Sequence, residues 1–581
     1  MRRLITEFLL FRAIDKFPQS RFDPQVWSNE MQNAGLHDSD PWLFNFVLDG
    51  VTNGFSLQVK EGATLDKTNR NLPTTPTGDI KITKWLLDAI RKGWAIGPFK
   101  PDGIPRDLFP NGVHVNPLGA VPKPNGKIRP IVHCSAPRSG RSVNSEMYEE
   151  WKTVRYTRFI DIVRLVKEVG QNGYLWCADA ADAYLQLTLK HRDTKYVAVN
   201  WLGLIVVFTV LIFGLSSAPK IYTHFADAIE RIVVSNGDST LWHGRDSIQL
   251  IRHYLDDFFG GHRDLNCANE QFDCFLRLLR TLNIPYAPHK VVRPSREQKL
   301  LGFIWDTTSM VVRIPQTKID SITSTLKDLL RLKRKRPTKQ ELLSIVGKLR
   351  WFSVTMFGAQ AFVRRIEQQA YSVKRLSDHV RINSGIRRDI QFWLDGFSTL
   401  KQGVSLDFLL KNPSHGDIHV YTDASGCIGM GGVSSEGYWY QTRWQSIWPG
   451  KQKIDIFFGE MLAVVVFVYC NAHRWTGKSI TFHCDNEAVE WTLRRKRCTF
   501  KRNDTADLIR IMCLLAIKHR FYFWIARVAT DDNGLADALS RFNNTKLNEC
   551  VSSGEWTDFP LNAELSGENI RSFCSSLEYI P

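Results

Sequence analysis

One stretch constrains the fold of this chain more than any other. Two adjacent carboxylates, Asp256 and Asp257, follow an apolar run and precede two phenylalanines and two glycines. The apolar residues on both sides predict two short strands with the acidic pair at the turn between them. Unpaired carboxylates are costly to bury, so a metal cation is their natural partner. The alternative is a surface hairpin whose aspartates only favour the turn. The stretch alone leaves both interpretations open.

Length and charge narrow the class of protein. A chain of 581 residues is too long for one core, so several domains are expected. Its formal net charge of +17 predicts a polyanionic partner, with nucleic acid first and an anionic membrane second. The most apolar run, residues 201–215, is too short to span a bilayer and predicts buried strands, so no membrane partner is expected. Eleven scattered cysteines without a C-x-x-C pair indicate reduced thiols and an intracellular protein, cytoplasmic or nuclear.

Two basic segments offer candidate phosphate contacts. The turn signal at residues 124–126 predicts a hairpin that carries Lys123 and Arg129, and such groups pair strongly with triphosphate oxygens. The alternative is a solvated basic hairpin. The run 331–336 is compatible with a nucleic-acid contact, with a solvated face or with a nuclear-import signal. Thr338 and Glu341 then predict a capping box at the start of a helix.

Carboxylates recur where apolar strands end. Asp179 follows such a strand, and Asp182, three residues later, could cap a helical turn. Asp423 and Asp485 also follow strands in the second half of the chain. With Glu460 and Asp537 on predicted helices, the chain offers two separate acidic clusters: Asp179, Asp256 and Asp257, then Asp423, Glu460, Asp485 and Asp537. Pairs of divalent ions about 3.5–4 Å apart, held by such clusters, catalyse phosphoryl transfer. The competing hypothesis is a nucleic-acid-binding protein whose acids form turns, caps and salt bridges.

The first cluster lies in motifs of a known family. Residues 254–257 match the Y-x-D-D motif of reverse transcriptases, and residues 179–184 resemble their D-x-x-D-A-Y motif. Residues 213–219 resemble the F-G-L-x-x-A-P form of retrotransposons, while Lys290 and residues 301–303 fit the later palm motifs. The order and spacing of these motifs resemble a retroelement reverse transcriptase.

The second cluster resembles a retroelement RNase H domain. The matching segments are 422–425, Glu460, 485–486 and 536–541. The resemblance covers roughly residues 85–541. Many RNase H enzymes carry a histidine in the loop at residues 530–533, which has none here, so the rate of cleavage is in question.

Three stretches, 97–99, 117–123 and 133–144, resemble the DIRS group of tyrosine-recombinase retrotransposons; Gypsy-like elements and pararetroviruses are the nearest alternatives. His133 and Cys134 stand where many relatives have an aspartate-based motif, which leaves the detail of the fingers open. No protease, integrase or recombinase signature is found, so those functions are expected on other chains.

The resemblance implies residue roles. Asp179 and Asp256, with Asp257 beside them, would bind the polymerase metals, and the second cluster would bind two more. Tyr184 would exclude a ribose 2′-hydroxyl, and Asn533 would assist near product release. Residues 331–365 would track the duplex backbone. The implied nucleotide-binding residues are Lys123, Arg129, Asp182, Ala183, Tyr184, Phe213, Gly214 and Lys290.

The resemblance also implies a fold class, α+β and α/β multidomain: a right-hand polymerase of fingers, palm and thumb, followed by an RNase H-like mixed β-sheet domain. The predicted segments are an N-terminal extension (1–80), fingers and palm (81–315), a helical thumb and connection (316–410), the RNase H-like domain (411–545) and a polar, loosely ordered C-terminal tail (546–581).

The implied activity is RNA-directed DNA synthesis with degradation of the RNA strand. The cofactor would be Mg²⁺, or Mn²⁺ in its place, with two ions per active site. The partners would be an RNA template, a DNA primer, the RNA–DNA hybrid and deoxynucleoside triphosphates (dNTPs), and further an element-encoded recombinase and a capsid-like protein. The alternative is a degenerate or domesticated copy that binds nucleic acid without catalysis.

Overall fold

The computed structural model forms two compact units, Met1–Met310 and Val311–Pro581, which are described separately. The structure describes residues 2–67, 70–122, 128–235, 239–244, 248–331, 336–399, 403–410, 416–496, 503–552, 561 and 563–577. Lys123 and most of the basic run 331–336 therefore lie outside the described residues. Both units combine helices with sheets, which confirms the predicted α+β and α/β multidomain class.

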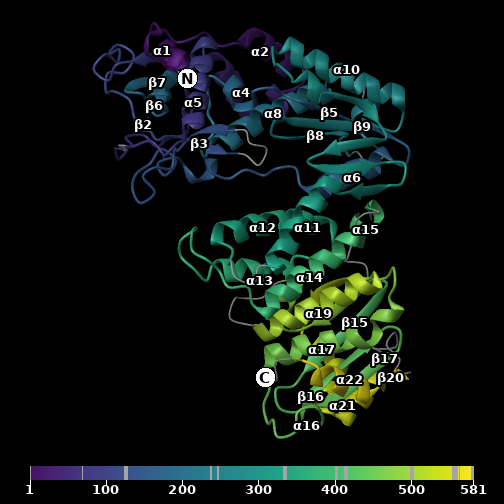
Figure 1. Ribbon diagram of the computed structural model, residues 1–581. Coiled ribbons are helices and arrows are strands. Elements are labelled where there is room, and N and C mark those ends of the chain that lie inside the picture. Colours follow the sequence, from purple (N-terminus) through teal and green to yellow (C-terminus); the bar gives the residue numbers. More distant parts are fainter. Residues whose placement is uncertain are drawn as a thin grey trace. The chain divides into compact units, whose positions relative to one another are not determined.

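The first unit contains an antiparallel sheet with the strand order β10-β5-β9-β8. Its strands are β5 (Tyr174–Asp179), β8 (Ile251–Tyr254), β9 (Asp257–His262) and β10 (Val292–Ser295). Helices α8 (Ala218–Ser235) and α10 (Leu265–Thr281) pack on this sheet and contact each other (Figure 1). The hairpin predicted around the acidic pair is confirmed as β8–β9.

A second sheet of this unit has the order β1-β7-β6-β2, from β1 (Ala95–Phe99), β2 (Val115–Asn116), β6 (Ala198–Trp201) and β7 (Leu204–Phe208). The predicted basic hairpin is confirmed as β3 (Leu118–Pro122) and β4 (Ile128–Val132). Helix α5 (Pro76–Arg91) begins at Pro76 because the Thr75 side chain caps it and proline suits the first helical turn. The unit also contains α6 (Phe159–Val169), α7 (His191–Thr194), α9 (Ser239–Trp242), β11 (Glu297–Leu300) and β12 (Phe303–Asp306).

The N-terminal helices belong to the core of the first unit. They are α1 (Arg2–Leu9), α2 (Pro24–Asn33), α3 (Leu36–Ser39) and α4 (Pro41–Asn53). Phe8, Trp27 and Val47 are buried in the same hydrophobic cluster as Trp176 and Phe225. The Trp27 and Phe225 ring centroids lie 4.8 Å apart, which ties α2 to α8.

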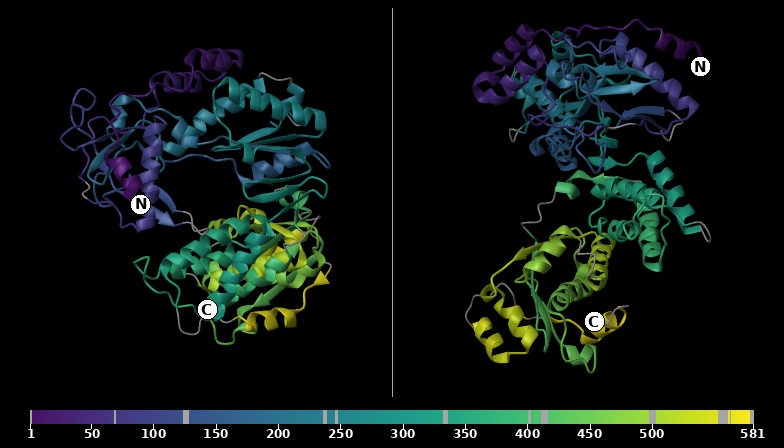
Figure 2. Two further views of the ribbon diagram at one scale, coloured as in Figure 1. Left: turned by 45° about the horizontal axis from the view of Figure 1, so that its top comes forward. Right: turned by 90° about the vertical axis from the view of Figure 1, so that its left-hand side faces the viewer.

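The short strand β13 (Val311–Arg313) begins the second unit, and helices follow it: α11 (Gln316–Arg331), α12 (Lys339–Phe352), α13 (Ala361–Ala370) and α14 (Ser384–Thr399) (Figure 2). The predicted capping box is present at the start of α12, where Glu341 accepts from the Thr338 amide and donates its own amide to the Thr338 side chain. The short elements β14 (Val404–Ser405) and α15 (Leu406–Leu410) come after α14.

A six-stranded mixed sheet completes the second unit, with the order β19-β18-β15-β16-β17-β20. Its strands are β15 (Ile418–Ala424), β16 (Gly429–Ser434), β17 (Tyr438–Arg443), β18 (Ser479–Cys484), β19 (Tyr522–Arg527) and β20 (Ala563–Glu564). Strands β15, β18 and β19 are parallel neighbours, and β15 to β17 are antiparallel. The helices around it are α16 (Trp444–Ile447), α17 (Ile456–Asn471), α18 (Glu487–Arg495), α19 (Asn503–His519), α20 (Gly534–Arg541), α21 (Asn544–Ser552) and α22 (Gly567–Ser575). The mixed sheet predicted for this region is therefore present.

The C-terminal tail differs from the prediction. Strand β20 adds to the sheet beside β17, and α22 buries Ile570, Phe573 and Cys574. The Phe573 ring stacks on Tyr469 of α17 with centroids 4.5 Å apart. The tail was expected to be loosely ordered because its sequence is polar, but three apolar residues on one helix are enough to attach it to α17.

Helix α17 is the hydrophobic centre of this unit. Residues Ile456–Arg474 are apolar and long enough to cross a membrane by length and composition alone, but 72% of the window is buried inside the unit. The helix contacts β15, β16 and α19, and its interior is uniformly apolar because protein surrounds it. This burial is that of a core helix.

Candidate active sites

The first acidic cluster forms where β5 ends and β9 begins. Asp179 and Asp257 are direct partners across the two strands, and Asp256 lies in the turn before β9. The Ala180 amide donates to the Asp256 carbonyl oxygen at 2.9 Å, which draws that turn onto the end of β5. Strand alternation then places Asp179 and Asp257 on the face opposite Trp176, whose ring packs against Phe275 of α10. The structure therefore brings all three predicted polymerase carboxylates together.

The two glycines after the acidic pair have a packing reason. A Cβ atom at Gly260 would lie 2.7 Å from the Trp176 ring, and one at Gly261 would lie 2.5 Å from the Tyr174 carbonyl oxygen. Larger residues would push β9 away from β5 and separate Asp257 from Asp179. The glycines therefore hold the strand that carries Asp257 in close contact with its neighbour.

Positive charge already faces this cluster. Lys290 Nζ lies 2.6 Å from Asp179 Oδ2, and its hydrogen bond to that carboxylate raises the pKa of Lys290. Desolvation and the charges of Asp256 and Asp179 raise the pKa of Asp257 to about 6. Desolvation, with the charge of Asp179, also raises the pKa of Asp256. Three mutually repelling carboxylates with hard oxygen donors suit a divalent cation such as Mg²⁺.

Tyr184 and Phe213 form an aromatic wall on the route to the carboxylates. Tyr184 is buried, Phe213 is 52% exposed, and their ring centroids lie 4.9 Å apart. Burial, with the charges of Tyr156 and Asp256 among others, raises the pKa of Tyr184, so its hydroxyl stays neutral. The two rings are tilted by 51° and offer a partly solvated aromatic surface beside Asp256. Such a surface suits the packing of a sugar or a base.

Gly214 connects this wall to the basic hairpin. Its φ angle is +111°, and a Cβ there would lie 2.3 Å from the Val132 carbonyl oxygen at the end of β4. The Asn144 side chain donates to the Gly214 carbonyl at 2.8 Å and accepts from the Ser216 amide at 2.9 Å. Only glycine allows this approach, so the loop after Phe213 is attached to the strand that carries Arg129.

The remaining predicted nucleotide-binding residues lie in different surroundings. Asp182 has a φ of +62° and makes no side-chain cap to the following turn, so its possible role as a helix cap is not observed. Ala183 is buried with a φ of +35°. Arg129 is exposed on β4, and no contact between its side chain and the carboxylates is present among the described residues. Lys123 lies outside the described residues. Lys290 contacts Asp179.

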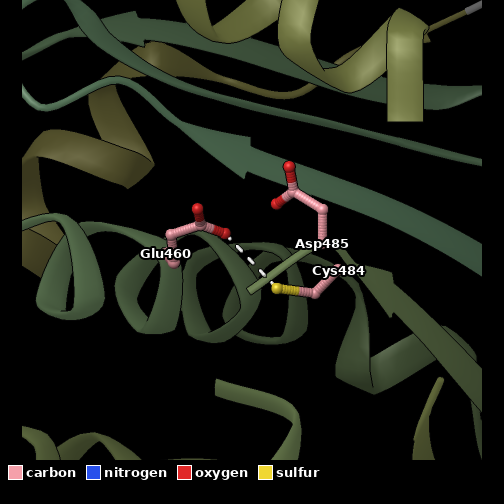
Figure 3. Close-up of side chains that lie close together, drawn as sticks. All are labelled: Glu460, Cys484 and Asp485. Atoms are coloured by element: carbon pink, nitrogen blue, oxygen red, sulfur yellow. Dashed lines mark hydrogen bonds between the residues drawn. The ribbon is translucent and has the colours of Figure 1, made fainter. Parts of the chain in front are cut away.

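The second cluster gathers around the end of β15. Asp423 lies on β15, Glu460 on α17, Asp485 directly after β18 and Asp537 on α20. The ligand atoms of Glu460, Cys484 and Asp485 all lie within 4.8 Å of one another (Figure 3). Parallel pairing of β15 with β18 brings Asp423 and Asp485 to the same edge of the sheet. The four predicted carboxylates therefore share one region.

Burial and mutual repulsion perturb these acids. Burial and the charges of Asp423 and Asp485 raise the pKa of Glu460 to about 9. Burial, together with the charges of Asp485 and Asp537, raises the pKa of Asp423 to about 6, against the opposing hydrogen bond from Ser540. Such shifts are typical of carboxylates placed to share a cation. This donor set also fits Mg²⁺.

Asp537 is held differently from its neighbours. Arg541 Nε lies 2.6 Å from Asp537 Oδ1, and Lys546 Nζ lies 2.7 Å from Oδ2. Burial opposes the charged form of Asp537, but these two cations lower its pKa. A cation bound at this position would have to compete with Arg541 and Lys546.

Four side chains that contact the second cluster were not predicted: Ser540, Cys484, Arg541 and Lys546. Ser540 Oγ donates to Asp423 Oδ2, and Cys484 Sγ donates to Glu460 Oε2 at 3.3 Å. Arg541 lies four residues after Asp537 on α20, and this i,i+4 spacing could have indicated their pairing from sequence. No sequence signal marks Cys484, because its partner lies 24 positions away.

Asn533 lies at the start of α20, next to the second cluster. Its side chain is fully buried, and its Nδ2 donates to the Thr422 carbonyl oxygen at 3.2 Å. It therefore attaches the start of α20 to β15. Its expected role near product release stays a prediction.

Comparison with known proteins gives remote similarities. No protein-family model matches the chain, and no curated protein matches it. The chain is similar in structure to the foamy viral protease-reverse transcriptase in complex with RNA/DNA hybrid, with 13% identity, a TM-score of 0.47, 89% of this chain covered and 64% of that chain covered. It is also similar to the foamy viral protease-reverse transcriptase in complex with dsDNA, with 14% identity, a TM-score of 0.46, 89% of this chain covered and 100% of that chain covered.

Proposed function

We propose that this protein is an RNA-directed DNA polymerase with RNase H activity. The observation that carries the proposal is the presence of two carboxylate clusters, one in each compact unit. Asp256 and Asp257 have raised pKa values in the first, and Asp423 and Glu460 in the second. Two clusters of this kind in a chain of net charge +17 fit two metal-dependent reactions on nucleic acid.

In the polymerase reaction, the primer 3′-hydroxyl attacks the α-phosphate of a dNTP, and pyrophosphate leaves. Asp179, Asp256 and Asp257 would hold two Mg²⁺ ions, which stabilise the charge on the attacking and leaving oxygens. Lys290 would exchange Asp179 for a phosphate oxygen when the nucleotide enters. Arg129 and Lys123 would pair with the triphosphate. The ring of Tyr184, held by Phe213, would lie under the sugar and exclude a 2′-hydroxyl.

In the second reaction, water cleaves a phosphodiester of the RNA strand in the hybrid. Asp423, Glu460, Asp485 and Asp537 would hold two Mg²⁺ ions that serve this hydrolysis. Ser540 orients Asp423 through its hydrogen bond, and Arg541 and Lys546 keep Asp537 ionised. The chain's own groups therefore keep three of the four carboxylates oriented before substrate arrives, since Cys484 also bonds Glu460.

We propose that the chain comes from a retroelement of the DIRS group, because the stretches 97–99, 117–123 and 133–144 resemble that group. Asn144, in the last stretch, holds the loop after Phe213 through Gly214 and Ser216, so this stretch reaches the nucleotide pocket. Gly97 has a φ of +104°, and a Cβ there would lie 2.7 Å from the Ile205 carbonyl oxygen. The partners that follow are an RNA template, a DNA primer, the hybrid and dNTPs, with the element's recombinase and capsid-like protein.

Primer extension on an RNA template, with and without Mg²⁺, tests the proposal. The purified protein is expected to extend a DNA primer with Mg²⁺ and dNTPs, and to shorten the RNA strand of the product. Omission of Mg²⁺ should stop both reactions. If the protein binds hybrid but makes no DNA with Mg²⁺ or Mn²⁺, the polymerase proposal fails, and a non-catalytic nucleic-acid-binding copy is the remaining interpretation.

A further inference from the structure

Tyr222 lies near the start of α8, behind the aromatic wall of the first unit. Its side chain is fully buried, and its ring centroid lies 5.6 Å from that of Tyr184 at an interplanar angle of 72°. Tyr184 in turn packs against Phe213. Helix α8 contacts both η2 (Ala183–Gln186), the short helical turn that carries Tyr184, and β8, which leads into the acidic turn. Tyr222 therefore lies close to the first carboxylate cluster.

The hydroxyl of Tyr222 is buried and has no hydrogen-bond partner among the residues that the structure describes. The ring itself fits its surroundings, where it also packs near Phe225 with centroids 5.9 Å apart. A phenylalanine would make the same ring contacts and would avoid the cost of an unpaired polar atom in the core. The hydroxyl therefore lowers the stability of the resting protein, and a role in the reaction would explain its presence.

The charges of the first cluster act on this phenol. Burial raises the pKa of Tyr222 well above its ordinary value, and the charge of Asp256 raises it further, followed by that of Asp179. Because an electrostatic interaction weakens with distance, this order points to Asp256 as the nearest carboxylate. The hydroxyl keeps its proton at neutral pH, so it can donate a hydrogen bond to a carboxylate oxygen.

A hydrogen-bonded pair attaches α8 to the strand before the acidic turn. Asp227, five residues after Tyr222 on α8, places Oδ1 3.0 Å from His253 Nε2 of β8. His253 precedes Asp256 by three residues, and the Thr157 hydroxyl donates to its carbonyl oxygen at 2.5 Å. The helix that carries Tyr222 and the turn that carries Asp256 are therefore held next to each other.

Asp256 has a weak hydrogen-bond donor in the resting protein. Burial raises the pKa of Asp256, and a hydrogen bond from its own backbone amide opposes that rise. A donor within the same residue cannot align well with the carboxylate, because the geometry is constrained by the short connection between them. A rotation of the side chain would therefore allow Asp256 to exchange this donor for a better aligned one.

We propose that Tyr222 is a positioning residue of the polymerase site, whose hydroxyl donates a hydrogen bond to the Asp256 carboxylate during DNA synthesis. The inference rests on the proposed polymerase function and extends it to a residue outside the three carboxylates. The hydrogen bond would select one side-chain conformation of Asp256 in the reacting complex. The same hydroxyl has no such role in the resting protein.

Tyr222→Phe tests the proposal because it removes the hydroxyl and keeps the ring. Single-nucleotide incorporation by the full chain is measured on a DNA-primed RNA template with Mg²⁺, and the unfolding temperature is measured without metal. Tyr440→Phe is the control with the same substitution. Tyr440 is a fully buried tyrosine of the second unit, and its hydroxyl donates to the Ala463 carbonyl oxygen at 2.9 Å.

Tyr222→Phe should lower kcat for dNTP incorporation at least about tenfold, because a hydrogen bond to a charged group is lost in the reacting complex. KM for the dNTP and the discrimination against ribonucleotides should stay near the wild-type values, since the ring still supports Tyr184. The unfolding temperature should equal or exceed that of the wild type, because a buried unpaired hydroxyl is removed. Tyr440→Phe should show the reverse pattern, a lower unfolding temperature with unchanged DNA synthesis.

Three results would overturn the proposal. An unchanged kcat in Tyr222→Phe, with an active wild type, would show that the hydroxyl has no part in synthesis. A lower unfolding temperature in Tyr222→Phe would show that the hydroxyl already has a partner in the resting protein. Loss of ribonucleotide discrimination together with kcat would show that Tyr222 acts through Tyr184 instead of Asp256. If the wild type makes no DNA, the proposed polymerase function itself fails, and this inference fails with it.

Discussion

Lys290 places its ammonium nitrogen 2.6 Å from Asp179 Oδ2, so a side-chain cation already neutralises one member of the first carboxylate cluster. The same arrangement recurs in the second unit, where Arg541 and Lys546 hold Asp537. In both places the chain provides positive charge beside carboxylates that would otherwise repel one another. The metal and these side chains are therefore expected to compete for the same oxygens.

Replacement of Lys290 by Met should make the fold more dependent on Mg²⁺. Without the ammonium group, Asp179, Asp256 and Asp257 repel one another in the metal-free protein, and about 1 kcal/mol of stability should be lost, since Lys290 is half exposed. Saturating Mg²⁺ should restore most of the difference in unfolding temperature. Lys299→Met, at an exposed residue of β11, is the control. An equal response of both variants to Mg²⁺ would contradict this expectation.

Tyr184 should decide which sugar the polymerase accepts. Tyr184→Ala removes the ring beside Phe213 and opens space under the nucleotide, so incorporation of ribonucleotides relative to deoxynucleotides should rise by about tenfold or more. Tyr184→Phe keeps the ring and should retain discrimination. Single-nucleotide extension with a matched dNTP and ribonucleotide measures the incorporation ratio of both variants. An unchanged ratio in Tyr184→Ala would show that the ring is not the steric gate.

The free energy of unfolding should depend on pH through an ion pair between β8 and α8. His253 of β8 places Nε2 3.0 Å from Asp227 Oδ1 of α8. Burial opposes the charged form of His253, but the bond to Asp227 and the charge of Glu230 raise its pKa above the ordinary 6.5. Burial likewise opposes the charge on Asp227, but the bonds from His224 and His253 lower its pKa to about 2.

These two pKa shifts change the free energy of unfolding in opposite pH ranges. The stabilisation from His253 is fully present below pH 6.5 and is lost as the pH rises through the raised pKa of this residue. The Asp227 contribution is present above pH 3.8, its ordinary value, and is lost as the pH falls towards 2. Unfolding temperature should therefore decline above neutrality, and His253→Gln should flatten that decline and cost about 1–3 kcal/mol at pH 6. His37→Gln, at an exposed histidine, should leave the profile unchanged.

Cys484 should make the RNase H site sensitive to thiophilic metals. Its sulfur lies with Glu460 and Asp485 in a group whose ligand atoms are within 4.8 Å of one another (Figure 3). Sulfur ligands favour Cd²⁺ or Zn²⁺ over Mg²⁺. Low Cd²⁺ should therefore inhibit RNA cleavage by the wild type and by Cys513→Ala, a control at another buried cysteine, but not by Cys484→Ala. Equal inhibition of all three proteins would rule out the thiol as a ligand.

Features of the sites that depend on neighbouring residues were predictable from the sequence. The turn at Asp256 and Asp257, the strand that ends at Asp179 and the capping box of Thr338 all depend on residues a few positions apart. Each of these features has a residue periodicity or spacing in the sequence that predicts it, and the structure contains it. The same holds for the basic hairpin β3–β4.

Contacts between distant residues were not predictable in this way. Lys290 and Asp179 are 111 positions apart, and Arg365 and Asp507 are 142 positions apart. Strand β20 has two residues, too few for any periodicity, so the tail seemed polar and was wrongly expected to be loosely ordered. Asn533 was assigned by resemblance, but its burial depends on how α20 packs against β15.

The two carboxylate clusters are proposed to act as independent metal-dependent sites on one hybrid, and a pair of variants tests this independence most directly. DNA synthesis and RNA cleavage should be measured on the same primed RNA template with Asp256→Asn and with Asp423→Asn. The proposal predicts that Asp256→Asn abolishes synthesis and retains cleavage of a preformed hybrid, and that Asp423→Asn does the reverse. Loss of both activities in either variant, with the fold intact, would contradict the two-site account.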